Sequence, residues 1–166
     1  NPRRTVQARY LSLLAGIRMK ISSIQDLQKV SNKIRKKIIP GDVLFLYGQI
    51  GVGKTTFTRM LINGFEKENK LKKSEVLSPT FNIVFQYKIN DFIVEHYDFY
   101  RLKSEKEINN TGLFENLEEV ITIVEWPELI KIKPKNRVDL FFKYNKNMTG
   151  RTLNIKTSGR LKIDGF

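Results

Sequence analysis

Gly48-Gln49-Ile50-Gly51-Val52-Gly53-Lys54-Thr55 is a complete phosphate-binding loop of the pattern Gly-x-x-x-x-Gly-Lys-[Ser/Thr]. Its glycines allow consecutive backbone N–H groups to turn inward around an anionic phosphate. Lys54 adds a positive charge, Thr55 offers a hydroxyl to a phosphate-bound Mg²⁺, and Thr56 offers a second hydroxyl. The loop therefore predicts a site for a nucleoside triphosphate.

The residues on either side of the loop have the patterns of a strand and a helix. Residues 42–47 form an apolar run of strand length, and apolar residues follow the loop at helical spacing, at Phe57, Met60, Leu61 and Phe65. Such a helix points the positive end of its dipole at the bound anion. We therefore prefer a nucleotide site over a glycine-rich turn in a βα unit with no ligand.

The remaining chain alternates further helices and strands. Ser23 is placed to cap a helix that ends before Pro40-Gly41, and residues 104–109 form a short polar helix at most. Residues 81–88 and 92–98 have the pattern of a β-hairpin, residues 120–124 that of a buried strand, and residues 137–144 and 151–157 that of a final strand pair. We expect a single α/β P-loop NTPase domain whose mixed sheet has a parallel centre and antiparallel edge strands, flanked by helices.

Composition excludes several classes of protein. With 166 residues and 40% hydrophobic content, the chain can bury a core of its own. Cysteine is absent, which excludes disulfides and thiolate metal sites and suits a reducing cytosol. No apolar run is long enough to span a bilayer. We expect a soluble, cytoplasmic protein without a membrane partner.

The net charge of +13 is distributed unevenly along the chain. Residues 1–18 contain four arginines, no lysine and no acid, whereas residues 19–166 contain 20 lysines and six arginines. The switch predicts that residues 1–18 are a non-native or disordered leader and that residues 19–166 form the P-loop domain. An artificial extension is the preferred account of the leader, ahead of a native disordered arm and an organellar transit peptide.

Lysines gather in two parts of the domain, at residues 67, 70, 72 and 73 and at residues 131, 133 and 135. Such a group of like charges attracts nucleic acid or an acidic partner. A solvated lysine-rich surface explains the same residues equally well, so the two interpretations stay open.

A phosphate loop also needs an acid that positions the metal, normally at the end of a neighbouring buried strand. Glu125 closes the most apolar strand and Asp98 closes the second arm of the hairpin. Because ligands gather outside the carboxyl ends of parallel strands, we expect Glu125 to hold Mg²⁺ together with Thr55, through a water. Asp98 is the candidate for orienting the attacking water or holding the γ-phosphate region. An acid that only caps a turn remains the alternative at both positions.

Ser78-Pro79-Thr80 lies between the loop's helix and the hairpin, where nucleotide switches carry a residue that senses the γ-phosphate. An ordinary turn before a strand has the same sequence pattern, so both interpretations stay open. His96 is the only histidine. Without a second histidine or a cysteine, we assign it no metal role.

In this order, the motifs closely resemble those of the TsaE (YjeE) family. They are the phosphate loop with Thr56, Ser78-Pro79-Thr80-Phe81, residues 96–102 (His-Tyr-Asp-Phe-Tyr-Arg-Leu), Gly112-Leu113 and Ile123-Val124-Glu125-Trp126-Pro127. The resemblance covers about residues 21–131 and departs from the family at Gln49 and Ile50, where an acid and a leucine are common.

The resemblance implies a small bacterial ATPase that assists N6-threonylcarbamoyladenosine formation in tRNA, acting with TsaB and TsaD. It implies that ATP and Mg²⁺ bind to residues 48–56 and Glu125, with Ser78, Thr80 and Trp126 also at the nucleotide. The expected catalytic residues are Lys54, Asp98 and Glu125, and contact with tRNA is expected to be indirect, through the complex.

Other functions are compatible with a phosphate loop. A GTPase needs an Asp-x-x-Gly switch, which is absent, and Asn136-Arg137-Val138-Asp139 matches a guanine-reading motif imperfectly, so ATP is preferred. A small-molecule P-loop kinase is the alternative function, although the arginines after the loop are too scattered for a recognisable lid. An interaction protein with a relic nucleotide site is the non-enzyme alternative. Since no built-in arginine finger is evident, we expect weak intrinsic Mg-dependent ATPase activity.

Overall fold

The computed structural model describes residues 16–162. Its strands are β1 (Ile17–Ile21), β2 (Val43–Tyr47), β3 (Val84–Ile89), β4 (Phe92–Asp98), β5 (Val120–Glu125), β6 (Arg137–Tyr144) and β7 (Arg151–Ser158). Its helices are α2 (Ile24–Arg35), α3 (Lys54–Glu68) and α4 (Glu105–Asn109), with a 3-10 turn, η1, at Leu117–Glu119.

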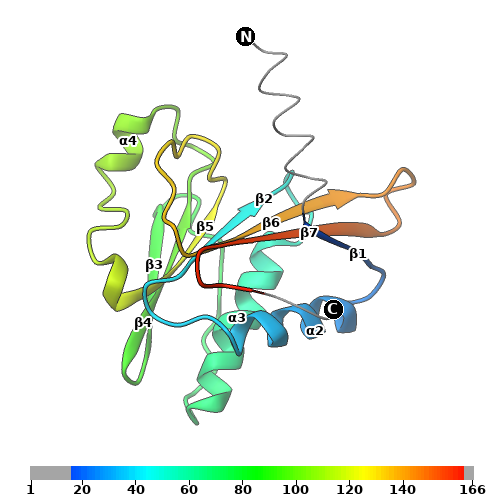
Figure 1. The fold of residues 1–166 in the computed structure, drawn as a ribbon, viewed down its shortest axis with the longest axis horizontal. Helices are drawn as coiled ribbons and strands as arrows, with labels where there is room; N and C mark the ends of the chain where they lie inside the picture. Colours follow the sequence, from blue (N-terminus) through cyan, green and yellow to red (C-terminus); the bar gives the residue numbers. More distant parts are fainter. Residues whose placement is uncertain (1–15, 163–166) are drawn as a thin grey trace.

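The strands form one sheet in the order β1-β7-β6-β2-β5-β4-β3 (Figure 1). The four neighbours β6, β2, β5 and β4 run parallel, whereas β1, β7 and β3 pair antiparallel at the two sides. This arrangement confirms the predicted mixed sheet with a parallel centre. The apolar run before the phosphate loop is its central strand, and four consecutive residues, Val43 to Leu46, are fully buried because both faces of β2 are covered.

Parallel pairing brings the carboxyl ends of three strands to one edge of the sheet. In the register, Leu46 of β2 lies opposite Glu125, and Asp98 at the end of β4 also lies opposite Glu125. The phosphate loop leaves β2 at this same edge. The topology thus places both predicted acids beside the loop.

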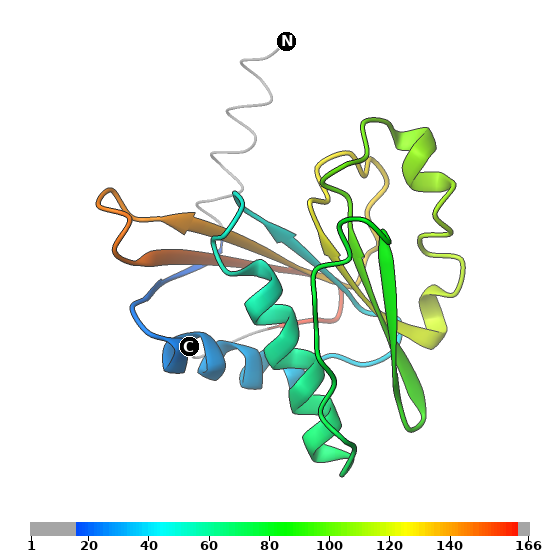
Figure 2. The ribbon, with the colours of Figure 1, turned by 180° about the vertical axis from the view of Figure 1, so that it is seen from behind.

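Helices α2 and α3 pack side by side on one face of the sheet (Figure 2). Ser23 caps α2 as predicted, and Asp26 completes a capping box with it. The face of α2 that carries Leu27, Val30 and Ile34 is buried against the sheet. Helix α3 buries a second apolar face, with Phe57, Leu61, Ile62 and Phe65, in the same core.

The other face of the sheet is covered by α4 and the long connections around it. Along β2, Leu44 and Leu46 face the core beneath α2 and α3, whereas Val43 and Phe45 face this second layer, as strand alternation requires. Ile108 of α4 packs there together with Tyr97, Phe99, Val124 and Ile130. The layer supplies the helical cover on the side of the site where Trp126 lies.

Several boundaries differ from the sequence-based expectation. Ile17 and Arg18, which we assigned to the leader, belong to β1, whose register with β7 runs from Ile17 opposite Ile155 to Ile21 opposite Arg151. Residues 1–15 of that expected leader lie outside the described residues. The capped helix ends at Arg35, short of Pro40-Gly41, and β3 begins at Val84 because Ile83 has a left-handed φ of 71°. β7 extends one residue further, to Ser158.

Within residues 16–162, no helix combines the length and the apolar character that crossing a bilayer requires.

Candidate active site

The phosphate loop has the conformation that its glycines predict. Gly48 and Gly53 have φ angles of 144° and 119°, which side-chain-bearing residues rarely adopt. A Cβ at Gly48 would lie 2.7 Å from the carbonyl oxygen of Phe142 and 2.8 Å from Cγ1 of Val52. Gly53 precedes α3 and makes no side-chain capping bond, so the N–H groups of the first helical turn are suited to an anion.

Lys54 reaches back across this loop. Its Nζ donates to the carbonyl oxygens of Gly48 and Gln49, and it lies 3.7 Å from the ring centroid of Trp126. Burial lowers the pKa of Lys54 below its ordinary value, and the neighbouring carboxylate of Glu125 opposes that shift. A desolvated cation in this position favours an anionic ligand.

Glu125 lies at the centre of a buried hydrogen-bonded group. Thr55 Oγ1 donates to both carboxylate oxygens, at 2.9 Å from Oε1 and 3.1 Å from Oε2. His96 Nε2 lies 2.5 Å from Oε2, and both His96 and Glu125 are buried. Since an ionised carboxylate only accepts hydrogen bonds, the imidazole Nε2 is the donor in this pair.

The sequence-predicted metal ligands therefore meet. Hydroxyl and carboxylate oxygens are ligands that Mg²⁺ prefers, and Mg²⁺ in nucleotide sites is commonly held by one or two protein groups plus phosphate oxygens. Residues 16–162 contain no group of three or more metal-binding His, Cys, Asp or Glu side chains. The pair formed by Thr55 and Glu125 fits the small protein contribution that a nucleotide-bound Mg²⁺ needs.

Asp98 is tied to the Ser78-Pro79-Thr80 segment. Its Oδ2 accepts from Ser78 Oγ at 2.6 Å and from Thr80 Oγ1 at 3.0 Å, and the two hydroxyl oxygens lie 2.9 Å apart. Its Oδ1 accepts from the backbone N–H of Tyr100 at 2.9 Å. The segment is thus anchored to the end of β4 by charge-assisted hydrogen bonds, and movement of Asp98 would release it.

A pocket of about 700 Å³ joins these groups. Of the sequence-predicted site residues, it is lined by Ile50, Gly51, Val52, Gly53, Lys54, Thr55, Thr56, Ser78, Thr80, Asp98, Glu125 and Trp126. Gly48 and Gln49 do not line it, and their carbonyl groups instead accept from Lys54. The volume is in the range of about 300–1,000 Å³ that small-molecule sites occupy.

Several residues of this site were not predicted. The Tyr100 ring lies 4.9 Å from that of Trp126, and the far wall of the pocket is formed by Ser22 to Ile24 and by Thr149 to Arg151. His96 was placed in a strand, but its contact with Glu125 was not foreseen. Strand alternation alone puts His96 on the same face as Asp98, two residues on, and this was the available signal.

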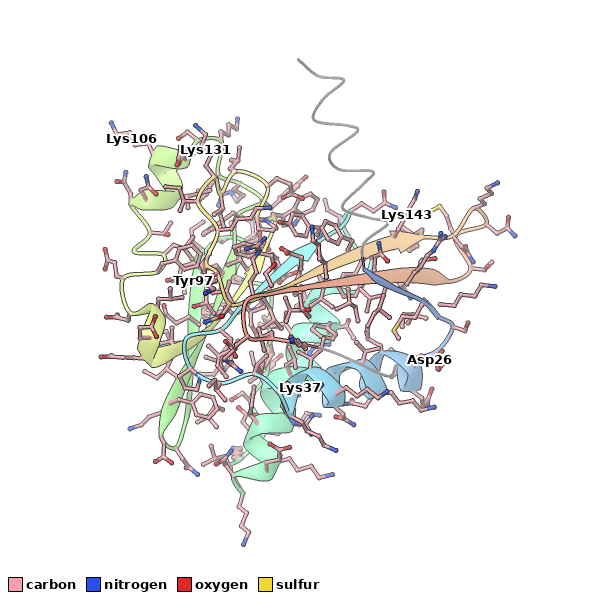
Figure 3. The ribbon with its side chains drawn as sticks, in the orientation of Figure 1. Asp26, Lys37, Tyr97, Lys106, Lys131 and Lys143 are labelled. Carbon is pink, nitrogen blue, oxygen red and sulfur yellow. The ribbon has the colours of Figure 1, made fainter. Side chains whose placement is uncertain are left out.

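The two lysine groups do not form one surface. Lys67 lies in the last turn of α3 and Lys70 to Lys73 follow that helix, whereas residues 131–135 lie in the β5–β6 connection, at the opposite end of the molecule (Figures 1 and 2). Lys131 Nζ lies 3.0 Å from Glu105 Oε2 near α4 (Figure 3). Lys133 Nζ donates to Tyr47 OH at 3.1 Å. A single basic patch built from both groups is therefore excluded.

Comparison with known proteins identifies relatives of this chain. The model of the family described as "Threonylcarbamoyl adenosine biosynthesis protein TsaE" matches residues 21–153. The protein named tRNA threonylcarbamoyladenosine biosynthesis protein TsaE is 38% identical in Rickettsia conorii, over 67% of this chain and 61% of that protein. The protein of the same name in Bacillus subtilis is 38% identical over 63% of each chain. The chain thus spans about three fifths of the length of these relatives.

The fold also has a solved counterpart. The crystal structure of YdiB from Bacillus subtilis superposes with a TM-score of 0.65 and 23% sequence identity, and the match covers 86% of each chain. At this level of identity the likeness shows the fold alone, and it agrees with the predicted α/β class.

Proposed function

The chain belongs to the TsaE family, and we propose that it binds and hydrolyses Mg·ATP in support of N6-threonylcarbamoyladenosine formation in tRNA. The observation that carries the ATPase proposal is the meeting of Thr55, at the start of α3, with Glu125, at the end of β5. This contact joins a phosphate loop to a buried carboxylate, which is the arrangement that phosphoryl transfer requires.

Side chains in the loop and next to it have defined tasks in this proposal. Lys54 exchanges the carbonyl groups of Gly48 and Gln49 for the β- and γ-phosphates. Thr55 and Glu125 hold Mg²⁺, which when bound neutralises charge on the phosphates. His96 fixes the carboxylate of Glu125 by donating to its Oε2. Trp126, beside Lys54, closes this end of the pocket.

Asp98 is proposed to couple the nucleotide to the protein surface. It holds Ser78 and Thr80 by their hydroxyl groups, and all three residues line the pocket. A γ-phosphate that interacts with Asp98 or with either hydroxyl group would compete with the hydrogen bonds that anchor Ser78-Pro79-Thr80. The exposed residues Leu77 and Phe81 flank this segment, so its movement alters a surface available to a partner.

The proposed partners are TsaB and TsaD in the cytoplasm, with tRNA contacted indirectly through the complex. These follow from the family resemblance. Intrinsic hydrolysis is expected to be weak, because the complex is proposed to complete the site or to use the switch.

Hydrolysis of ATP measured with and without TsaB, TsaD and tRNA tests this function. We expect slow turnover by the isolated chain and strong stimulation by the partners. Lys54→Ala should abolish turnover with the fold retained, whereas Lys88→Ala, an exposed lysine on β3, should leave it unchanged. Rapid phosphorylation of a small molecule without partners would instead support the kinase alternative.

The metal role of Glu125 is tested by Glu125→Ala. Metal-dependent turnover should collapse while part of the nucleotide binding survives, since Lys54 and the backbone of the loop are unaltered. Full activity in Glu125→Ala would transfer the metal role to Asp98.

A further inference from the structure

Arg151 comes from the last strand of the sheet to the mouth of the phosphate loop. It begins β7 and lies opposite Tyr144, the last residue of β6. Since β6 runs parallel to β2, this end of the β6–β7 hairpin is at the same edge of the sheet as the loop. The arginines that follow the loop are scattered in the sequence, but the fold brings this one into the lining of the nucleotide pocket.

The side chain of Arg151 is held beside the loop by packing. Its guanidinium carbon lies 5.4 Å from the ring centroid of Tyr144, and a Cβ at Gly53 would lie 3.9 Å from its Nε. The Nε atom is buried without a hydrogen-bond partner in the described part of the chain. No carboxylate among residues 16–162 forms an ion pair with it. A confined guanidinium without a counter-charge, in a pocket, favours an anionic ligand.

The strand order separates Arg151 from the metal side of the site. β5 and β4 lie on one side of β2 and carry Glu125 and Asp98, whereas β6 and β7 lie on the other side and carry Arg151. The contact between Thr55 and Glu125 marks the end of the pocket for the metal and the γ-phosphate. Gly53 and Arg151 therefore lie toward the other end of the pocket, where the α- and β-phosphates would bind. The backbone of such loops cradles these two phosphates.

We propose that Arg151 is a ligand of the α- and β-phosphates of the bound nucleotide, acting from the wall opposite Glu125. The proposal rests on the proposed function, because it assigns a further binding residue to the same site. The planar guanidinium donates to phosphate oxygens in a fork that lysine cannot reproduce. Because ATP and ADP share these two phosphates, Arg151 strengthens the binding of both nucleotides equally. It therefore sets how long ADP is retained after hydrolysis.

Calorimetric titration of the whole chain with Mg·ATP, Mg·ADP and AMP tests this assignment. Trp126 is the single tryptophan and lines the pocket, so its fluorescence supplies a second readout of binding. We expect Arg151→Gln to weaken ATP and ADP binding alike, by about tenfold or more, the effect of losing a hydrogen bond to a charged group. Arg151→Lys should be intermediate, because it keeps the charge and loses the fork.

Lys143→Gln is the matched control. Lys143 precedes Tyr144 on β6 near the same edge of the sheet, is exposed and is not in the pocket lining (Figure 3). The Lys143→Gln variant removes one positive charge without removing a contact to the nucleotide. Its Kd values for Mg·ATP and Mg·ADP should therefore equal those of the unaltered chain. Should Arg151→Gln fail to fold, Arg151→Met keeps the aliphatic stem against Tyr144 and removes the charge.

The outcomes distinguish a failure of the role proposed for Arg151 from a failure of the proposed ATPase function. Unaltered ADP affinity in Arg151→Gln or Arg151→Met would overturn the role of Arg151 and leave the ATPase proposal intact. A loss confined to ATP would also overturn it, because only a γ-phosphate ligand discriminates in that way. If the unaltered chain binds no adenine nucleotide, the proposed function itself fails.

Discussion

Replacement of His96 by alanine tests how the protein holds its candidate metal ligand. His96 is fully buried and its Nε2 lies 2.5 Å from Glu125 Oε2, so the variant removes a hydrogen-bond donor from a buried carboxylate. Leaving a buried acceptor without its partner costs about 1–3 kcal/mol. For a domain of this size, that corresponds to a fall in melting temperature of about 2–12 °C. Thr55 still donates to Glu125, which limits the loss.

A double-mutant cycle isolates the hydrogen bond from the space that the imidazole fills. His96→Ala, Glu125→Gln and the double variant are unfolded in urea without nucleotide, and the free energies of unfolding are compared. We expect a coupling energy of about 0.5–3 kcal/mol, in the range for residues in direct contact. His96→Gln retains an N–H donor and should recover part of the stability.

The same variants should differ in their response to metal. If His96 fixes Glu125, His96→Ala should need more Mg²⁺ for half-maximal ATP hydrolysis, and His96→Gln should need less than His96→Ala. This reasoning would be refuted if the stability losses of the two single variants summed to the loss of the double variant to within about 0.3–0.5 kcal/mol, and if the Mg²⁺ requirement were also unaltered. His96 would then only fill space in the core.

Three further predictions concern the conformation of the site and its surroundings. Gly48→Ala should destabilise the fold by about 1–3 kcal/mol from its left-handed φ alone, and weaken ATP binding, as urea unfolding and titration would measure. Asp98→Asn should retain ATP binding but lose stimulation of hydrolysis by the partner proteins, because Ser78 and Thr80 lose a charged acceptor; full stimulation would contradict the switch. The backbone N–H of Ser22 lowers the pKa of Asp26 below its ordinary value of 3.8, so the stability that this carboxylate gives to α2 is present above that pH and is lost as the pH falls through the lowered pKa. The stability difference between the unaltered chain and Asp26→Asn should accordingly be constant near neutral pH and shrink in acid.

Patterns confined to a few neighbouring residues were enough to predict the local parts of this protein. The loop from Gly48 to Thr55 specifies its own conformation, because its glycines tolerate backbone angles that other residues disfavour. The Ser23 cap and the hairpin of β3 and β4 also depend on residues close together in the chain. From these, the P-loop class and a parallel sheet centre followed. Glu125 and Asp98 were found because both close strands.

The contacts between these parts depend on strand order and register, which no local pattern encodes. Antiparallel pairing of β1 and β7 gave Ile17 and Arg18 a place in the sheet, although their composition resembles the residues before them. The pairing of β4 with β5 set His96 against Glu125, and the return of β7 along β6 carried Arg151 to Gly53. A neighbour supplied by a distant strand adds no periodicity to the sequence around it, so these residues became functional candidates only once the sheet had assembled.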